Sequence, residues 1–175
     1  MLTAAFAKEI LERNGVILLG AVEGLSLDEL HWQPGPESNS IAWLVWHLSR
    51  TQDNHRSAMD LTPHVWVSEG WHTKFGRSAD PADRGRGHTA EQVSAFRVPH
   101  LDTLLGYHAA VRAKTDAFLA RATEEDLERP APDVVGSAMV PAHHRLQMML
   151  VDNIQHSGQV AYLRGLLKGR GWLAA

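Results

Sequence analysis

The chain has 175 residues, of which 44% are hydrophobic and 21% are charged, and this composition is typical of one globular domain with a buried core. The formal net charge of −3 argues against nucleic-acid binding, and the absence of cysteine excludes disulfides, thiolate metal ligands and a cysteine nucleophile. We therefore expect residues 1–175 to form a single domain of a cytoplasmic protein. The 11 histidines favour a metal or proton-transfer site.

The first predicted element is a helix over about residues 3–22, in which apolar side chains recur on one face. We expect neither a signal peptide nor a membrane span there, because charged residues interrupt the apolar run at Lys8, Glu9, Glu12 and Arg13. The turn-rich bridge SLDELHWQPGP follows this helix. Within it, Ser26 and Glu29 predict a capping box that opens a short helical turn.

A second long helix is expected to begin after Ser38 or Asn39, which are both good N-caps, and to run to about Met59. The next stretch, residues 62–87, is rich in glycine and proline and predicts a long insertion with short helical turns. We expect this insertion to be ordered and packed, because it carries the aromatic residues Trp66, Trp71 and Phe75.

Thr89 is a predicted N-cap of a further helical turn, and a third long helix is expected over about residues 100–122. A connector, RPAPDVVGSAMVP, leads to a fourth long helix that begins near Pro141 and ends near Lys168. No segment alternates convincingly as a strand. The pattern therefore predicts an all-α four-helix bundle with a long, partly helical insertion after the second helix.

The fourth helix carries polar side chains on an apolar face, in the stretch VDNIQHSGQVAYLRG. Asp152 and His156 are four residues apart, and Gln159 continues the same arc. Such groups cost free energy on a buried face unless they are paired. A carboxylate and an imidazole at this spacing can bind one divalent ion, although a helix-surface ion pair is the ordinary interpretation of the same spacing.

His47 in the second helix is the candidate third ligand, if the second and fourth helices face one another. Two nitrogens and one carboxylate oxygen would then leave coordination positions open for water or substrate. The ligand set suits zinc, nickel, iron or manganese. Taken alone, His47 is more typical of a core histidine that donates to a carbonyl than of a ligand, and His108 in the third helix is a rival third ligand or a hydrogen-bond partner of a ligand. Gln159 could donate to a metal-bound oxygen or make a hydrogen bond within the bundle.

The other histidines carry no pattern that assigns them to a site. We expect His143 and His144 to be exposed, and we assign five more to the surface or to loops: His31, His55, His64, His72 and His100. Trp43 and Trp46 are expected in the core or an interface. His88 is a candidate for orienting substrate on the basis of its loop context alone.

Two segments, SIAWLVWHLSRTQDNH and DNIQHSGQVAYLRGLL, resemble the DinB-like family of metalloenzymes. The bridge LSLDELHWQPGPESNSIAWLVWHL is similar to that of the family, and GRGHTAEQV resembles its actinobacterial branch, which has a helical lid. The resemblance implies a four-helix bundle that holds a divalent metal between helices, commonly zinc or nickel, and often forms a homodimer. Some relatives are transferases or isomerases that use mycothiol or bacillithiol, and others resemble hydrolases.

The resemblance also implies a ligand set of three histidines. His47 matches the ligand in the second helix, and His156 matches the last ligand in the fourth. The residue four positions before the last ligand is normally histidine, but here it is Asp152. This departure keeps a group that can bind metal while it changes the charge and the hardness of the site.

Two functions follow as hypotheses. The first is a metal-dependent enzyme that acts on a small molecule as a hydrolase, or as a transferase or isomerase with an external thiol such as mycothiol, with Gln159 and His88 orienting the substrate. The second is a non-catalytic, ligand-binding or stress-related dimer whose metal site is vestigial. In that case Asp152 and His156 form a buried pair beside His47. Binding to DNA or to a membrane is not expected.

Overall fold

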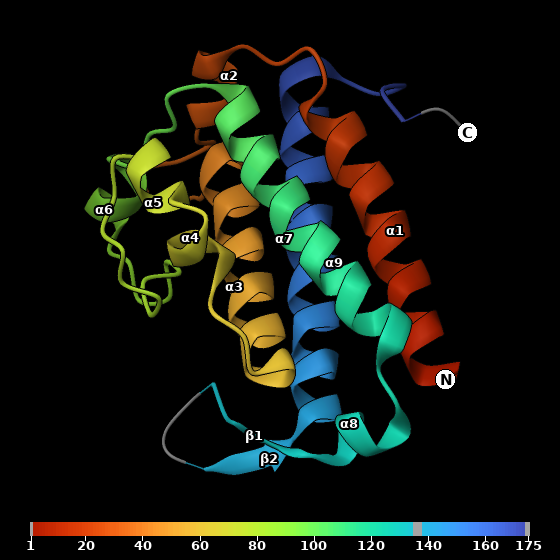
Figure 1. The fold of residues 1–175 in the computed structure, drawn as a ribbon. Helices are drawn as coiled ribbons and strands as arrows, with labels where there is room; N and C mark the ends of the chain where they lie inside the picture. The colour runs from red at the N-terminus through yellow and green to blue at the C-terminus, as the bar shows by residue number, and fades with distance from the viewer. Residues whose placement is uncertain (1, 135–137, 174–175) are drawn as a thin grey trace.

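Four long helices form the body of the protein in the computed structural model, which describes residues 2–134 and 138–173 (Figure 1). They are α1 (Leu2–Val22), α3 (Ile41–Asp60), α7 (Leu101–Arg121) and α9 (Ala142–Lys168). Helices α7 and α9 each pack against both α1 and α3. The predicted all-α four-helix bundle is therefore confirmed.

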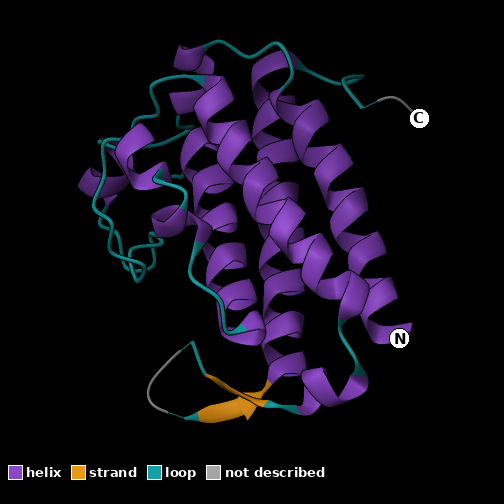
Figure 2. Ribbon diagram, viewed as in Figure 1, coloured by secondary structure: helices purple, strands orange, loops and turns teal. Residues whose placement is uncertain are grey.

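A long insertion, residues 61–100, separates α3 from α7. Both helices run in the same direction along the bundle, so the insertion carries the chain back to the end at which α3 began (Figure 1). It contains the three short helices α4 (Val65–Ser68), α5 (Trp71–Lys74) and α6 (Ala90–Ser94). Most of the rest is loop (Figure 2). Two other short helices, α2 (Leu27–His31) and α8 (Glu124–Glu128), lie in the connections at the two ends of the bundle.

The helix starts follow from local hydrogen bonding. The capping box of Ser26 and Glu29 opens α2, as predicted. Thr89 is the predicted N-cap of α6, and the structure shows that it forms a capping box with Gln92. The expectation that Ser38 or Asn39 caps α3 was wrong. Ser40 is the N-cap, because its hydroxyl accepts a hydrogen bond from the Trp43 amide at 3.3 Å.

The connector before α9 contains a small β-ribbon that the sequence pattern missed. Strands β1 (Pro130–Pro132) and β2 (Met139–Pro141) pair in antiparallel register, with Ala131 opposite Val140. Each strand has only three residues and carries a proline, so an alternating pattern had no room to appear. Residues 135–137 of the connector lie outside the described residues.

Helix α3 is the central element of the fold, since the bundle covers one side of it and the insertion covers another. Trp43 and Trp46 on this helix are only 6% and 0% exposed, so the expectation that they belong to the core is confirmed. Trp66 of the insertion packs edge-on against Trp46, with the ring centroids 6.4 Å apart. The insertion is thus a packed part of the fold, as its aromatic residues predicted.

Asp53 joins the insertion to the bundle. This fully buried carboxylate accepts hydrogen bonds from the amides of Val65 and Trp66, at 3.0 and 2.9 Å, and so caps the start of α4. It also pairs with Arg56 at 2.9 Å and accepts from the Tyr107 hydroxyl of α7 at 3.1 Å. A buried carboxylate is tolerated here because charged and polar donors surround it.

We predict that Asp53→Ala lowers the free energy of unfolding by about 3–5 kcal/mol, because the change removes the nearer of the two aspartates that pair with the buried Arg56. Urea unfolding followed by circular dichroism measures this effect. Asp116→Ala is the matched control, because Asp116 pairs with Arg112 four residues earlier on the partly exposed side of α7. That variant should lose only about 0.3–0.5 kcal/mol. Equal losses in the two variants would contradict the assigned role of Asp53.

Candidate metal centre

The three predicted ligands lie together where α3 packs against α9. His47 comes from α3, whereas Asp152 and His156 come from successive turns of α9. One carboxylate oxygen, Asp152 Oδ1, lies 3.6 Å from His47 Nε2 and 3.5 Å from His156 Nε2. The two imidazole rings are nearly perpendicular, with centroids 4.7 Å apart. The side chains are largely buried, with exposed fractions of 11%, 20% and 17% for His47, Asp152 and His156.

This geometry fits a divalent ion better than a hydrogen-bonded cluster. The separations of 3.5 and 3.6 Å exceed those of good hydrogen bonds. They match the roughly 3.0–3.6 Å expected between two ligands that each lie about 2.0–2.2 Å from one ion. One ligand atom from each residue lies within 4.8 Å of the other two. In addition, Asp152 Oδ2 is buried without a hydrogen-bond partner in the described part of the chain.

Hydrogen bonds fix both imidazoles in the form that binds metal. His47 Nδ1 donates to the backbone carbonyl of Arg84, and His156 Nδ1 donates to Gln159 Oε1 at 2.8 Å. These assignments place the proton on Nδ1 of each ring and leave the Nε2 lone pairs directed toward Asp152. Outer partners of this kind orient histidine ligands and increase their basicity.

The electrostatic environment keeps Asp152 ready to bind a cation. Burial alone would raise the pKa of Asp152, but the imidazoles of His156 and His47 outweigh burial and hold the pKa below its ordinary value. Burial alone would lower the pKa of His156, but Asp152 and Gln159 raise it above its ordinary value. The carboxylate is therefore ionised at neutral pH, as a metal ligand must be.

Comparison with protein families supports the assignment of the chain to a four-helix-bundle fold. A model of the DinB superfamily matches residues 10–160. The chain belongs to the DinB superfamily. Its structure resembles that of a conserved protein from Enterococcus faecalis, with a TM-score of 0.83 and 28% sequence identity over 95% of this chain and 97% of that chain. The comparison with curated proteins gives no match.

The superfamily match confirms the DinB-like resemblance, whereas assignment to the actinobacterial branch stays a prediction. None of the helices in the described part of the chain is both long and apolar enough to cross a membrane.

The insertion of this DinB-superfamily chain helps to build the site through its backbone. Arg84 supplies the carbonyl that orients His47, and Gly85 follows at a φ of +86° against the ring of Trp43. Trp43 in turn stacks on His47, with ring centroids 4.7 Å apart and an angle of 6° between the planes. A Cβ atom at position 85 would lie 2.6 Å from Trp43 Cζ2, so only glycine fits at this position.

His88 lies behind Trp43. Its Nδ1 accepts a hydrogen bond from Trp43 Nε1 at 3.2 Å, and its Nε2 lies 3.2 Å from Asp83 Oδ1, to which it donates. The structure therefore connects His88 to the site through Trp43. Its role in orienting substrate stays a prediction, because His88 does not line the cavity that adjoins His47 and Asp152.

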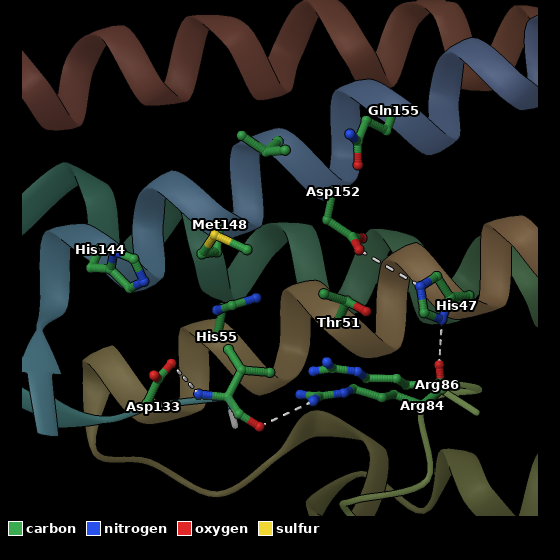
Figure 3. Close-up of a pocket in the computed structure, with 12 residues that line it drawn as sticks. His47, Thr51, His55, Arg84, Arg86, Asp133, His144, Met148, Asp152 and Gln155 are labelled. Carbon is green, nitrogen blue, oxygen red and sulfur yellow. Dashed lines mark hydrogen bonds and ion pairs between the residues drawn. The ribbon is translucent and has the colours of Figure 1, made fainter. Parts of the chain in front are cut away.

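A cavity of about 430 Å³ adjoins the metal centre (Figure 3). Two of the three candidate ligands, His47 and Asp152, line it, so a bound ion would be accessible from the cavity. The rest of the lining comes from α3, α9, the insertion and the region of the β-ribbon: Thr51, His55, Arg84, Arg86, Asp133, Val134, His144, Met148, Val151 and Gln155.

The expectation that His55 is a surface residue was wrong. It is 2% exposed, lines the cavity, and has a pKa lowered to about 3, chiefly by burial. His144 was expected to be exposed, but it is half-buried and lines the same cavity. The spacing carried a signal, because His47, Thr51 and His55 recur every four residues on α3. His144 precedes Asp152 by eight residues, which is the same repeat on α9.

The other predicted residues have separate surroundings. His108 is buried against Ser49, with its Nδ1 3.1 Å from the hydroxyl, and lines a different cavity between α1 and α7. Burial lowers its pKa to about 4. His31 was assigned to the surface or a loop; it is half-buried, donates to the Leu27 carbonyl and accepts from the Val98 amide. His64 and His72 are half-buried, whereas His100 and His143 are exposed as expected.

We predict that Gly85→Ala weakens zinc binding about 10- to 100-fold, because the added methyl group displaces the backbone that orients His47. Competition with a chromophoric chelator measures the affinity. Gly87→Ala is the matched control: its φ of +83° imposes similar backbone strain, but no atom lies within 4 Å of the added carbon. Gly87→Ala should bind zinc within a few-fold of the parent protein. Unchanged affinity in Gly85→Ala would show that Arg84 does not position the ligand.

Proposed function

We propose that this DinB-superfamily protein is a divalent-metal-dependent enzyme that acts on a small molecule in the cavity beside His47, Asp152 and His156. One observation carries the proposal. Three donor atoms converge within 4.8 Å at the wall of a cavity of about 430 Å³, and the second nitrogen of each imidazole is already held by an acceptor. A core hydrogen-bond network would need no such opening.

The ligand set determines what an ion could do there. When bound, a zinc or nickel ion supplies Lewis-acid activation of a substrate oxygen or thiol. Asp152 brings one negative charge and a hard oxygen donor, which also suits iron or manganese. His156 and Gln159 act as one unit, since the amide oxygen holds the imidazole in its ligating orientation.

Two reaction classes remain within the proposal. The chain contains no cysteine, so a thiol-dependent transferase or isomerase must use an external thiol such as mycothiol, in line with the resemblance to the actinobacterial branch. A hydrolase would use water from the open side of the cavity. Turnover that requires an added low-molecular-weight thiol would select the first class, and turnover without thiol would select the second.

A non-catalytic bundle is the alternative. The separations of 3.5 and 3.6 Å also allow Asp152 to form a buried pair with the two imidazoles, without any metal. Such a cluster would make the protein indifferent to chelators, whereas a metal that binds only the native state adds to its stability. Chelation therefore discriminates between the two interpretations.

We predict about one divalent ion per chain in protein purified without chelator, measured by elemental analysis. His47→Ala and His156→Ala should each lose it, and His100→Ala, which alters an exposed histidine, should retain it. Removal of the ion should lower the melting temperature. A ligand whose free concentration is about 1,000 times its Kd adds about 4 kcal/mol to the free energy of unfolding. Full occupancy in both alanine variants would refute the ligand assignment. An ion-free protein that also fails to take up added metal would favour the non-catalytic bundle.

We also propose that the protein forms a homodimer through α1 and α9. Large apolar side chains on this side are exposed, including Phe6 at 64%, Ile154 at 49% and Tyr162 at 69%. Phe6 and Ile154 line an apolar cavity of about 550 Å³ between the two helices. Exposed apolar side chains around such a cavity are typical of protein interfaces.

Analytical ultracentrifugation tests the dimer. We predict that Ile154→Glu raises the dissociation constant at least about 10-fold, because a charge would be buried at the interface. Leu19→Glu is the matched control, since Leu19 is also 49% exposed but lies on the side of α1 that faces α7. A monomeric parent protein at micromolar concentration would rule out this interface, as would a dimer that Ile154→Glu leaves intact.

A further inference from the structure

The cavity beside the metal centre carries guanidinium groups that have no carboxylate partner. Arg84 and Arg86 extend from the insertion and line the cavity, where their side chains lie side by side (Figure 3). Arg145 of α9 shares a polar partner with Arg84. None of these three arginines takes part in an ion pair among the described residues. By contrast, Arg56, Arg77 and Arg112 each pair with an aspartate at 2.9 Å.

Neutral groups hold two of these arginines in place. Arg84 donates to Asn54 Oδ1 at 3.0 Å and to the Val134 carbonyl at 3.4 Å. Arg145 donates to the same Asn54 Oδ1 at 2.7 Å, so one amide oxygen serves two cations. This arrangement orients the guanidinium groups without giving either of them a carboxylate as a hydrogen-bond partner.

The charges repel one another. Burial and the nearby charge of Arg86 lower the pKa of Arg84, and burial and Arg84 lower the pKa of Arg145 to about 10. Asp133 and Asp152 are the acidic residues in the lining of the cavity, and Asp152 belongs to the metal centre. An anion placed among the arginines would therefore gain favourable Coulomb energy.

Two further polar atoms at this cavity lack partners in the described structure. Thr51 Oγ1 and His55 Nδ1 are buried without a hydrogen bond, and both residues lie in the lining. Such atoms cost free energy unless a ligand or water satisfies them. The imidazole of His55 is neutral because burial lowers its pKa to about 3, so its Nδ1 can either donate a hydrogen bond to a ligand or accept one.

We propose that the cavity binds a small organic oxyanion whose carboxylate or phosphate group is held by Arg84 and Arg86, while its reacting group lies toward His47 and Asp152. This inference rests on the proposed function, because it names the substrate class of the same site. Planar guanidinium groups bind both kinds of oxyanion through paired hydrogen bonds. Thr51 and His55 would contact the polar atoms between the two ends of the substrate.

The decisive experiment compares two ligands on zinc-loaded protein by calorimetry. Succinic monohydroxamic acid and butanohydroxamic acid share the metal-binding group and the chain length, but one ends in a carboxylate and the other in a methyl group. We expect the carboxylated compound to bind at least about 10-fold more tightly, because its carboxylate forms charge-assisted hydrogen bonds that the methyl group cannot form. Equal affinities on zinc-loaded protein would overturn the inference and leave the proposed metal site standing.

Variants test which arginines cause the tighter binding of the carboxylated compound. Arg86→Gln should remove most of the advantage of the carboxylated compound without changing the affinity for butanohydroxamic acid, because Arg86 does not contact the metal centre. Arg84→Gln should act in the same direction, since the substitution keeps the backbone carbonyl that holds His47. Arg170→Gln, which alters an exposed arginine after α9, should keep the full advantage. An advantage that survives both cavity variants would overturn the assignment to these arginines.

Metal-free protein separates failure of this inference from failure of the proposed function. Succinate and inorganic phosphate should each bind the metal-free protein weakly, with shifts of amide resonances that Arg86→Gln abolishes. This result would support the oxyanion site even if elemental analysis found no metal site, and the tighter of the two ions would indicate the type of oxyanion. Absence of binding by both ions would count against the site whatever the metal content.

Discussion

The hydrogen bond from His47 to the Arg84 carbonyl is the constraint on which the rest of the site depends. It orients a candidate metal ligand on α3 through the backbone of the insertion, which lies more than 30 residues later in the chain. The contact requires the insertion to lie directly against the Trp43 ring, and glycine at position 85 makes this approach possible. The candidate metal centre thus depends on both the bundle and the insertion, although all three candidate ligands belong to bundle helices.

The polar residues of α3 explain why the insertion can be so closely fixed. Arg50 is buried and donates to the carbonyls of Asp80, Pro81 and Asp83, while Asp53 caps the start of α4. Loop carbonyls and amides that would otherwise be buried without partners are satisfied by charged side chains of the helix. The backbone around Arg84 is therefore held from the same helix that carries His47, and this shared anchoring limits the movement of ligand and acceptor relative to each other.

Sequence reasoning predicted what depends on local periodicity. The four long helices, the capping box of Ser26 and Glu29, and the placement of Asp152 and His156 on one arc all follow from spacing within single elements. His47 could be named as the third ligand only on the condition that the second and fourth helices face one another, because spacing within one helix says nothing about a helix about 100 residues later. The resemblance to DinB-like proteins favoured that condition. Contacts such as the sharing of Asn54 by two arginines depend on tertiary packing of three segments and leave no local pattern. The burial of His55 was missed for the same reason, although its four-residue spacing from Thr51 was present.

The charges that line the cavity give a physical reason for an aspartate, rather than a histidine, at position 152. Resemblance to the family implies three neutral ligands, and with such a set a divalent ion would add two positive charges next to Arg84 and Arg86. A carboxylate at position 152 removes one of these charges, and its field already favours the charged form of Arg84. The aspartate thus reduces repulsion between metal and arginines before any anion enters. A bound oxyanion would still find net positive charge, so Asp152 and the arginines are compatible parts of one site.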